Sequence, residues 1–166
     1  MGLRSRLSPG ANDLPTLALT QDLDAAARLR TAIGRLSRRL RTTAAARDAG
    51  LTPTAISLLL NVARSGPMRM SELADSEGIN PTMLSRAIAG MVQDGLLERT
   101  SDEGDRRAAW VKATASGRRL AERMRRERTG AVDQALAELS EDERQRIERA
   151  LPALEALAEE LRGKRP

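Results

Sequence analysis

The chain has 166 residues, 40% of them hydrophobic, and its 28 basic and 23 acidic residues give a net charge of +5, which favours a polyanionic partner. It has no cysteine and no histidine, which excludes disulfides, thiolate zinc sites and the ordinary hydrolytic triad. It has one tryptophan and no Phe or Tyr, which excludes the aromatic platforms that stack single-stranded nucleic acid, so double-stranded DNA stays open as a partner.

Residues 1–19 mix Ser, Pro, Gly, Asn and Asp with scattered Leu, which predicts a flexible N-terminal arm. From Leu23 the pattern is helical, and the helix is expected to end near Gly50. Its apolar stripe, at spacings of four, three and four, consists of Leu29, Ile33, Leu36 and Leu40. Seven arginines and no acidic residue lie between Ala25 and Arg47, which is typical of a solvated face, with a phosphate-facing or partner-facing role as the alternative.

Two helices are then marked by their start and stop signals. Thr52 is expected to cap a helix that begins at Pro53 and that residues 65–67, Ser-Gly-Pro, bring to an end. Ser71 is expected to open a short helix that Gly78 closes.

A third helix is expected directly afterwards, with Asn80 as its cap, Pro81 at its first position and Gly95 at its stop. Because residues turn by ~100° each, its two faces can be separated. The predicted core face holds Leu84, Ile88, Met91 and Val92, and the opposite face holds Thr82, Ser85, Arg86, Ala89 and Gln93. Short polar side chains of this kind suit a helix that enters the major groove, and an ordinary amphipathic helix is the alternative. The tight spacing from the second helix is typical of a helix-turn-helix.

The runs "LLERT" and "RAAWVKAT", joined by a turn-rich segment, predict a short β-hairpin. A hairpin after a helix-turn-helix makes a winged helix. In its loop, Asp105 would form a charge-assisted hydrogen bond to the guanidinium of either Arg106 or Arg107. The other arginine would then be free to enter the minor groove of DNA. The alternative is a surface turn with incidental charges. The acidic spacing does not fit a calcium-binding EF-hand.

The last third of the chain predicts two more helices. One runs from Thr114 towards Leu139, and Ser140 with Glu143 forms a capping box for the other. Pro152 is expected to kink or restart the last helix. That helix has a regular apolar stripe of Ile147, Leu151, Leu154, Ala158 and Leu161. With the stripe of the first helix it predicts a two-fold interface between two copies, with packing inside the monomer as the alternative.

The stretch from Ile79 to Gly117, with "TMLSRAIAGMVQDGLLER" and "DEGDRRAAWVKATASG", closely resembles the MarR (multiple antibiotic resistance regulator) family, and a weaker resemblance extends from Leu23 to Leu161. It implies a mainly α fold. A winged helix-turn-helix DNA-binding domain with a small β-hairpin wing would span residues 51–113, and N- and C-terminal helices at 20–50 and 114–166 would form a helical dimerisation domain. The chain departs from the family's pattern at Ala113, usually a larger aliphatic, and at Trp110, where a smaller residue is expected.

The resemblance implies a transcriptional regulator, a repressor that binds double-stranded DNA as a homodimer on a near-palindromic operator and is released by a small-molecule effector. The lack of a long apolar run at the start of the sequence or of a membrane-spanning stretch predicts a cytoplasmic location. The effector would bind between the dimer helices and the winged domain. The predicted DNA-binding residues are Ser71, Asn80, Pro81, Thr82, Ser85, Arg86, Gln93, Asp105, Arg106 and Arg107.

A winged-helix protein-interaction or dimerisation module without specific DNA binding is the main alternative. No Gly-rich phosphate loop or pair of catalytic carboxylates is recognisable, so we predict no enzyme, no catalytic residue, no cofactor and no metal site. No uncharged apolar stretch reaches the ~18 residues of a membrane span, so no membrane partner is expected.

Overall fold

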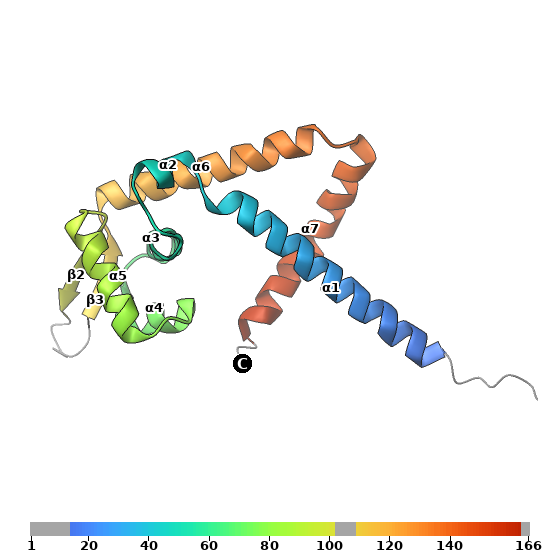
Figure 1. Cartoon of the computed structure of the whole chain (residues 1–166), viewed down its shortest axis with the longest axis horizontal. Coiled ribbons are helices and arrows are strands. Elements are labelled where there is room, and N and C mark those ends of the chain that lie inside the picture. The colour runs from blue at the N-terminus through green and yellow to red at the C-terminus, as the bar shows by residue number, and fades with distance from the viewer. Residues whose placement is uncertain (1–13, 102–108, 164–166) are drawn as a thin grey trace, which may run out of the picture. The chain divides into compact units, whose positions relative to one another are not determined.

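The computed structural model describes residues 14–101 and 109–163, and it is mainly helical with one small antiparallel sheet (Figure 1). This confirms the predicted fold class. The elements are α1 (Leu14–Arg41), α2 (Ala44–Asp48), α3 (Pro53–Ser65), β1 (Met68–Arg69), α4 (Met70–Glu77), α5 (Pro81–Gln93), β2 (Leu97–Ser101), β3 (Ala109–Ala113), α6 (Ala115–Ala137) and α7 (Glu141–Gly163). The chain divides into two compact units, residues 1–41 and residues 42–166, which are described separately.

In the first unit, helix α1 differs from the prediction at both ends. It begins at Leu14, so the prediction of an irregular arm through residue 19 is wrong for residues 14–19. Pro15 lies in the first turn, where a missing N–H costs nothing, and good helix formers follow it. The helix ends at Arg41 rather than near Gly50, because Thr43 has an extended backbone and caps a separate helix, α2.

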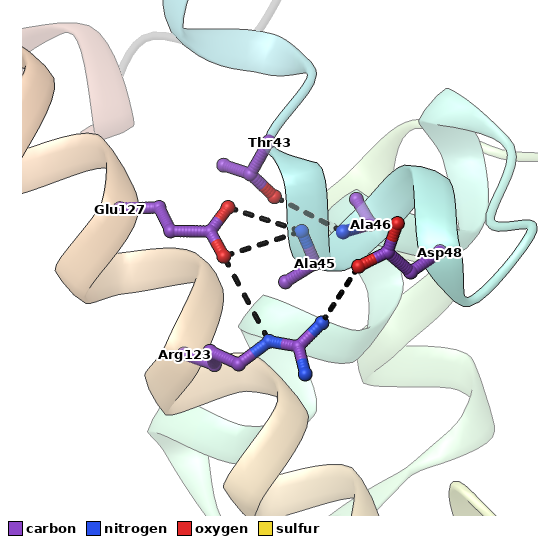
Figure 2. Close-up of polar contacts among 6 residues, drawn as sticks. All are labelled: Thr43, Ala45, Ala46, Asp48, Arg123 and Glu127. Atoms are coloured by element: carbon purple, nitrogen blue, oxygen red, sulfur yellow. Dashed lines mark hydrogen bonds and ion pairs between the residues drawn. The ribbon is translucent and has the colours of Figure 1, made fainter.

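In the second unit, the short helix α2 is fixed to the long helix α6 by polar contacts at its N-terminus (Figure 2). The buried Thr43 hydroxyl accepts a hydrogen bond from the backbone N–H three residues on. The Glu127 carboxylate on α6 accepts a second from the Ala45 N–H, with its two oxygens 3.0 and 3.2 Å from that nitrogen. Arg123 bridges the two helices, 3.3 Å from Asp48 and 3.7 Å from Glu127. The N–H groups that a helix leaves unpaired at its start are therefore satisfied from two parts of the chain.

Replacing Glu127 with glutamine is expected to lower the free energy of unfolding by about 1 kcal/mol, because the cap of α2 loses its charge. Chemical denaturation at one protein concentration measures this change. The matched control is Glu122→Gln on the same helix. In the part of the chain that the structure describes, Glu122 pairs with Arg126 and Arg125, at 3.5 and 3.9 Å, and all three side chains are at least 41% exposed, so its effect should stay within about 0.5 kcal/mol. Equal effects of the two substitutions would contradict the capping role of Glu127.

The core of the second unit lies where helices α2 to α6 and the sheet meet. It consists of aliphatic and methionine side chains, and the largest fully buried ones are Leu58, Leu59, Leu73, Leu84, Ile88, Leu97, Met124, Val62 and Val111. The predicted limits of α3 are confirmed, since Thr52 accepts a hydrogen bond from the Ala55 N–H, Pro53 is the first helical residue and Gly66 follows the last. Every helix around this core presents one apolar face to it, as amphipathic periodicity requires.

The sheet has the strand order β1-β3-β2, and all neighbours are antiparallel. The hairpin of β2 and β3 confirms the predicted pair of strands. Strand β1 was not predicted, because it has two residues and pairs with β3 far along the chain. The two residues that depart from the family's pattern lie on opposite faces of β3. Ala113 is 3% exposed and faces the core, whereas Trp110 is partly exposed on the other face.

Helix α7 begins with the predicted capping box. Ser140 and Glu143 exchange backbone-to-side-chain hydrogen bonds of 3.0 and 3.3 Å, and the bond from the Ser140 hydroxyl holds the pKa of the Glu143 carboxyl below its ordinary value. A kink or a restart was expected at Pro152, and the helix runs through it to Gly163 without a restart. Its apolar stripe is exposed, including Ile147, Leu151, Leu154 and Leu161 at 39%, 47%, 39% and 62%. Among the residues that the structure describes, no helix combines the length and apolar character needed to cross a bilayer.

Candidate nucleic-acid interface

Helix α5 starts as the sequence predicts. The Asn80 side chain accepts a 2.8 Å hydrogen bond from the Thr82 N–H, and Pro81 is the first helical residue. Both residues are exposed. The cap fixes where α5 begins, and it leaves the first turn of the helix open to solvent.

The two faces of α5 separate largely as predicted. Leu84, Ile88 and Met91 are at most 2% exposed, which confirms them as the core face. Val92 is 38% exposed, so its assignment to that face is wrong. It sits at the edge of the apolar arc, where burial depends on a neighbouring element that the helical period alone does not reveal. The polar face is exposed as predicted: Thr82, Ser85, Arg86, Ala89 and Gln93.

Helix α4 is held against α3 by a ladder of polar side chains. The Glu77 carboxylate accepts 2.6 Å hydrogen bonds from the Ser57 hydroxyl and from the Asn61 amide, and the same amide donates to the Ser76 hydroxyl at 3.0 Å. Helices α4 and α5 form the helix-turn-helix, so these hydrogen bonds hold in place the helix that directly precedes α5. Sequence reasoning missed this ladder, since its members come from two helices.

Ser71 does not open α4. The helix begins at Met70 after Arg69, whose backbone N–H donates a 3.1 Å hydrogen bond to the Glu72 carboxylate. A side chain three residues into a helix can satisfy the cap position in this way, so no Ser, Thr, Asp or Asn is needed there. Ser71 itself lies exposed in the first turn. Gly78 ends the helix as predicted, at φ 64°.

The C-terminal end of α5 is fixed to the start of α6. Gly95, at φ 67°, turns the chain, and Leu96 donates to the Met91 carbonyl at 2.9 Å. Thr114 then joins the two helices: its hydroxyl donates to the Gly95 carbonyl at 2.7 Å and accepts from the Gly117 N–H at 3.0 Å. The predicted cap at Thr114 is confirmed, and it also positions the end of α5.

The wing is built on the pairing of Leu97 with Ala113 through Ser101 with Ala109. Leu97 and Val111 anchor its base in the core, each at most 1% exposed. Towards the loop the residues of β2 are exposed and those of β3 are partly exposed. Asp105, Arg106 and Arg107, predicted at the tip, lie outside the described residues.

The structure adds two candidates that sequence reasoning missed. Met83, 65% exposed, stands beside Thr82 in the first turn of α5, and Arg99 is exposed on β2 of the wing. The helical period places Met83 on the flank of the polar face, a signal that its apolar character obscured. Within residues 14–101 and 109–163, acidic side chains form no cluster of three or more that could hold a metal ion.

Three comparisons place this arrangement among known proteins. The model of the MarR family matches residues 51–109. The HTH-type transcriptional regulator MT0903.1 of Mycobacterium tuberculosis is 31% identical over 142 residues, covering 86% of this chain and 98% of the relative. The likeness therefore includes the helices on both sides of the winged domain.

Two solved structures have the same fold. The transcriptional regulator Tm0710 from Thermotoga maritima is 24% identical with a TM-score of 0.69, covering 86% of this chain and 99% of that one. Wild-type MarR from E. coli in its apo form is 19% identical with a TM-score of 0.67, covering 78% and 94%. At these identities the likeness concerns the arrangement of the backbone.

Proposed function

The chain belongs to the MarR family of transcriptional regulators, and we propose that it binds a near-palindromic operator as a homodimer and represses transcription. The observation that carries this proposal is the exposed polar face of α5, where Thr82, Ser85 and Arg86 are held by a capped and buttressed helix. Short hydroxyl side chains let a helix backbone approach the base edges, and an arginine can bind a guanine through two hydrogen bonds.

The other predicted residues surround this face. In the proposal, Gln93 extends the polar face of α5, and Ser71, Asn80 and Pro81 approach the DNA backbone beside it. Asp105, Arg106 and Arg107 belong to the wing, where one guanidinium would enter the minor groove and the carboxylate would hold the other.

The homodimer is supported by the apolar surface of the terminal helices. The large apolar residues on α7 from Ile147 to Leu161 are 37–62% exposed, and Ile33 and Leu36 on α1 are 46% and 62% exposed. An apolar stripe that stays in contact with water in the single chain favours burial against a second copy. Two reading helices related by a two-fold axis then require half-sites about one DNA turn apart.

This arrangement also allows regulation. A small molecule that favours a different angle between the subunits would move the two reading helices out of register and release the operator. The effector step is part of the proposal, and a screen for compounds that raise the melting temperature and weaken operator binding tests it.

The proposal is tested by selecting duplexes from a random-sequence pool with the wild-type protein. We expect enrichment of a near-palindrome. Replacing Arg86 with alanine should weaken binding to the selected duplex about tenfold or more, because a bidentate base contact is lost, and should change binding to an unrelated duplex little. Fluorescence anisotropy measures both affinities.

Arg126→Ala on α6 serves as the control, because Arg126 is exposed and, among the described residues, forms an ion pair with Glu122 alone, at 3.5 Å. It should leave the preference between the two duplexes intact. A pool that enriches no sequence would favour a winged-helix protein-interaction module instead. If the wild type and Arg86→Ala prefer the selected duplex over the unrelated one to the same degree, Arg86 on α5 does not read the DNA sequence.

A further inference from the structure

Met83 is an exposed apolar side chain beside the polar residues that the proposed function assigns to DNA. It lies in the first turn of α5 and is 65% exposed. Met91 on the same helix and Met124 on α6 fill the core, at 2% and 0% exposure. Packing inside the chain therefore does not account for Met83. Because single apolar residues are common on protein surfaces, its position on the helix must decide its role.

The helical period places Met83 on the flank of the polar face of α5. Three residues turn the helix by ~300°, so Met83 lies ~60° from Arg86 around the axis. Pro81 is the first residue of α5, which makes Met83 the third. A reading helix contacts base edges chiefly through its N-terminal residues. Met83 is therefore at the end of α5 that would enter the major groove.

Beyond Met83, the same flank of α5 consists of small residues. Ala87 and Gly90 lie one and two turns further along the helix, and both are half-buried. In the part of the chain that the structure describes, a methyl group added at Gly90 would meet no neighbouring atom within 4 Å. Residues this small let a helix backbone approach a ligand closely. Met83 is thus the long side chain that projects from this flank.

The chemistry of a thioether limits what Met83 can recognise. It has no hydrogen-bond donor, and its sulfur is a weak acceptor, so it cannot read the donors and acceptors of a base edge. The apolar feature that a base presents in the major groove is the C5-methyl group of thymine. An unbranched side chain with three rotatable bonds can adapt its shape to such a group. Contact between the two removes apolar surface of both from water.

We propose that Met83 packs against the C5-methyl group of a thymine in each half-site and is a specificity-determining residue. Thr82, Ser85 and Arg86 supply donors and acceptors to the same groove, and Met83 adds an apolar contact that favours thymine at one position. The inference rests on the DNA binding proposed above, and it names a feature of the base sequence that this surface recognises.

Replacing thymine with deoxyuridine tests this contact, because the change removes the methyl group and leaves the hydrogen-bonding edges of the base intact. Each thymine of the duplex selected by the wild-type protein is replaced singly, and fluorescence anisotropy measures the affinities. We expect one position in each half-site at which the wild type loses about fourfold in affinity, as for one methyl group that is no longer buried.

Met83→Ala completes a cycle between protein and DNA. This variant should bind the thymine duplex at least about fourfold more weakly than the wild type does, because the apolar contact is lost. It should lose no further affinity when deoxyuridine replaces thymine at the sensitive position. The thermal unfolding midpoint should stay close to that of the wild type, since the side chain is exposed.

Three further variants separate the methyl contact from a general effect on the helix. Met83→Leu keeps an apolar side chain and should retain the response to deoxyuridine, whereas Met83→Gln keeps the length but ends in a polar amide and should lose it. Val92→Ala is the matched control, because Val92 is an exposed apolar residue near the other end of α5, at 38% exposure. It should respond to deoxyuridine as the wild type does.

The outcomes are distinguishable. A selected half-site without a sensitive thymine, or unchanged operator affinity in Met83→Ala, would overturn this proposal and leave the proposed function standing. An equal response to deoxyuridine by the wild type and Met83→Ala would show that another residue contacts the methyl group, and it would overturn the proposal as well. Failure of the wild type to enrich any sequence would overturn the proposed function and this proposal with it.

Discussion

Replacing Gly117 with alanine is expected to lower the free energy of unfolding by about 3 kcal/mol and to abolish or severely weaken DNA binding. A methyl group at this position would lie 2.0 Å from the Leu96 carbonyl oxygen and 3.2 Å from the Leu59 side chain. The contact with the Leu96 carbonyl involves a backbone atom, which cannot rotate away as a side chain can. Either α6 or the corner formed by Gly95 and Leu96 between α5 and β2 must therefore move. The cost therefore resembles that of an overpacked core.

The effect on DNA binding follows from what that corner does. Leu96 accepts a 3.1 Å hydrogen bond from the Thr114 N–H, and the Thr114 hydroxyl also bonds the Gly95 carbonyl. These contacts fix the end of α5 and the first residue of β2, so a displaced corner tilts the reading helix and shifts the wing together. Thermal unfolding should show a midpoint lowered by about 10 °C, and anisotropy should show the loss of operator affinity.

Gly130→Ala is the matched control, because Gly130 lies on the same helix and a methyl group there meets nothing within 4 Å. It should leave stability unchanged or raise it by up to about 1 kcal/mol, since alanine is the better helix former. Comparison at equal protein concentration is needed for a protein proposed to dimerise. A Gly117→Ala protein as stable as Gly130→Ala would show that the close approach at Leu96 does not constrain the fold.

The starts of α5, α6 and α7 could be predicted because capping is local chemistry. Asn80, Thr114 and Ser140 each bond an N–H two or three residues away, and the sequence contains both partners of each bond. The exposed polar face of α5 could be predicted for a similar reason, since the helical period places it opposite a core face. These local features were enough to establish the order of the elements in the winged domain, apart from β1.

Features that join distant segments could not be predicted in this way. The bond between Glu127 and the Ala45 N–H spans 82 residues, and no local pattern distinguishes Glu127 from the other acidic residues of α6. Strand β1 is too short to show a period of two, and its partner in β3 lies far along the chain. The contact of the Arg69 guanidinium with the Trp110 ring depends on that same pairing, so the sequence showed only an unexpected tryptophan.

Replacing Leu154 with glutamate is expected to convert the proposed homodimer into monomers and to reduce operator binding to the weak binding that any duplex shows. Leu154 is 39% exposed and lies in the middle of the apolar stripe of α7, between Leu151 and Leu161. A second copy packed on this stripe would bury a charge without a partner, which costs several kcal/mol and raises the dissociation constant by more than about a hundredfold. Sedimentation equilibrium measures the oligomeric state, and circular dichroism shows whether the helices persist.

Ala156→Glu introduces the same charge two residues later, about 200° around the helix and on the opposite face. It should leave both dimerisation and operator affinity close to those of the wild type. Because a monomer presents one reading helix, Leu154→Glu should lose the affinity that comes from engaging two half-sites at once, while retaining weak, salt-sensitive binding to any duplex. If the Leu154→Glu protein remains dimeric, the dimer interface does not include this stripe. If it is monomeric and still binds the near-palindrome as tightly as the wild type, the proposed binding by two symmetry-related helices is wrong.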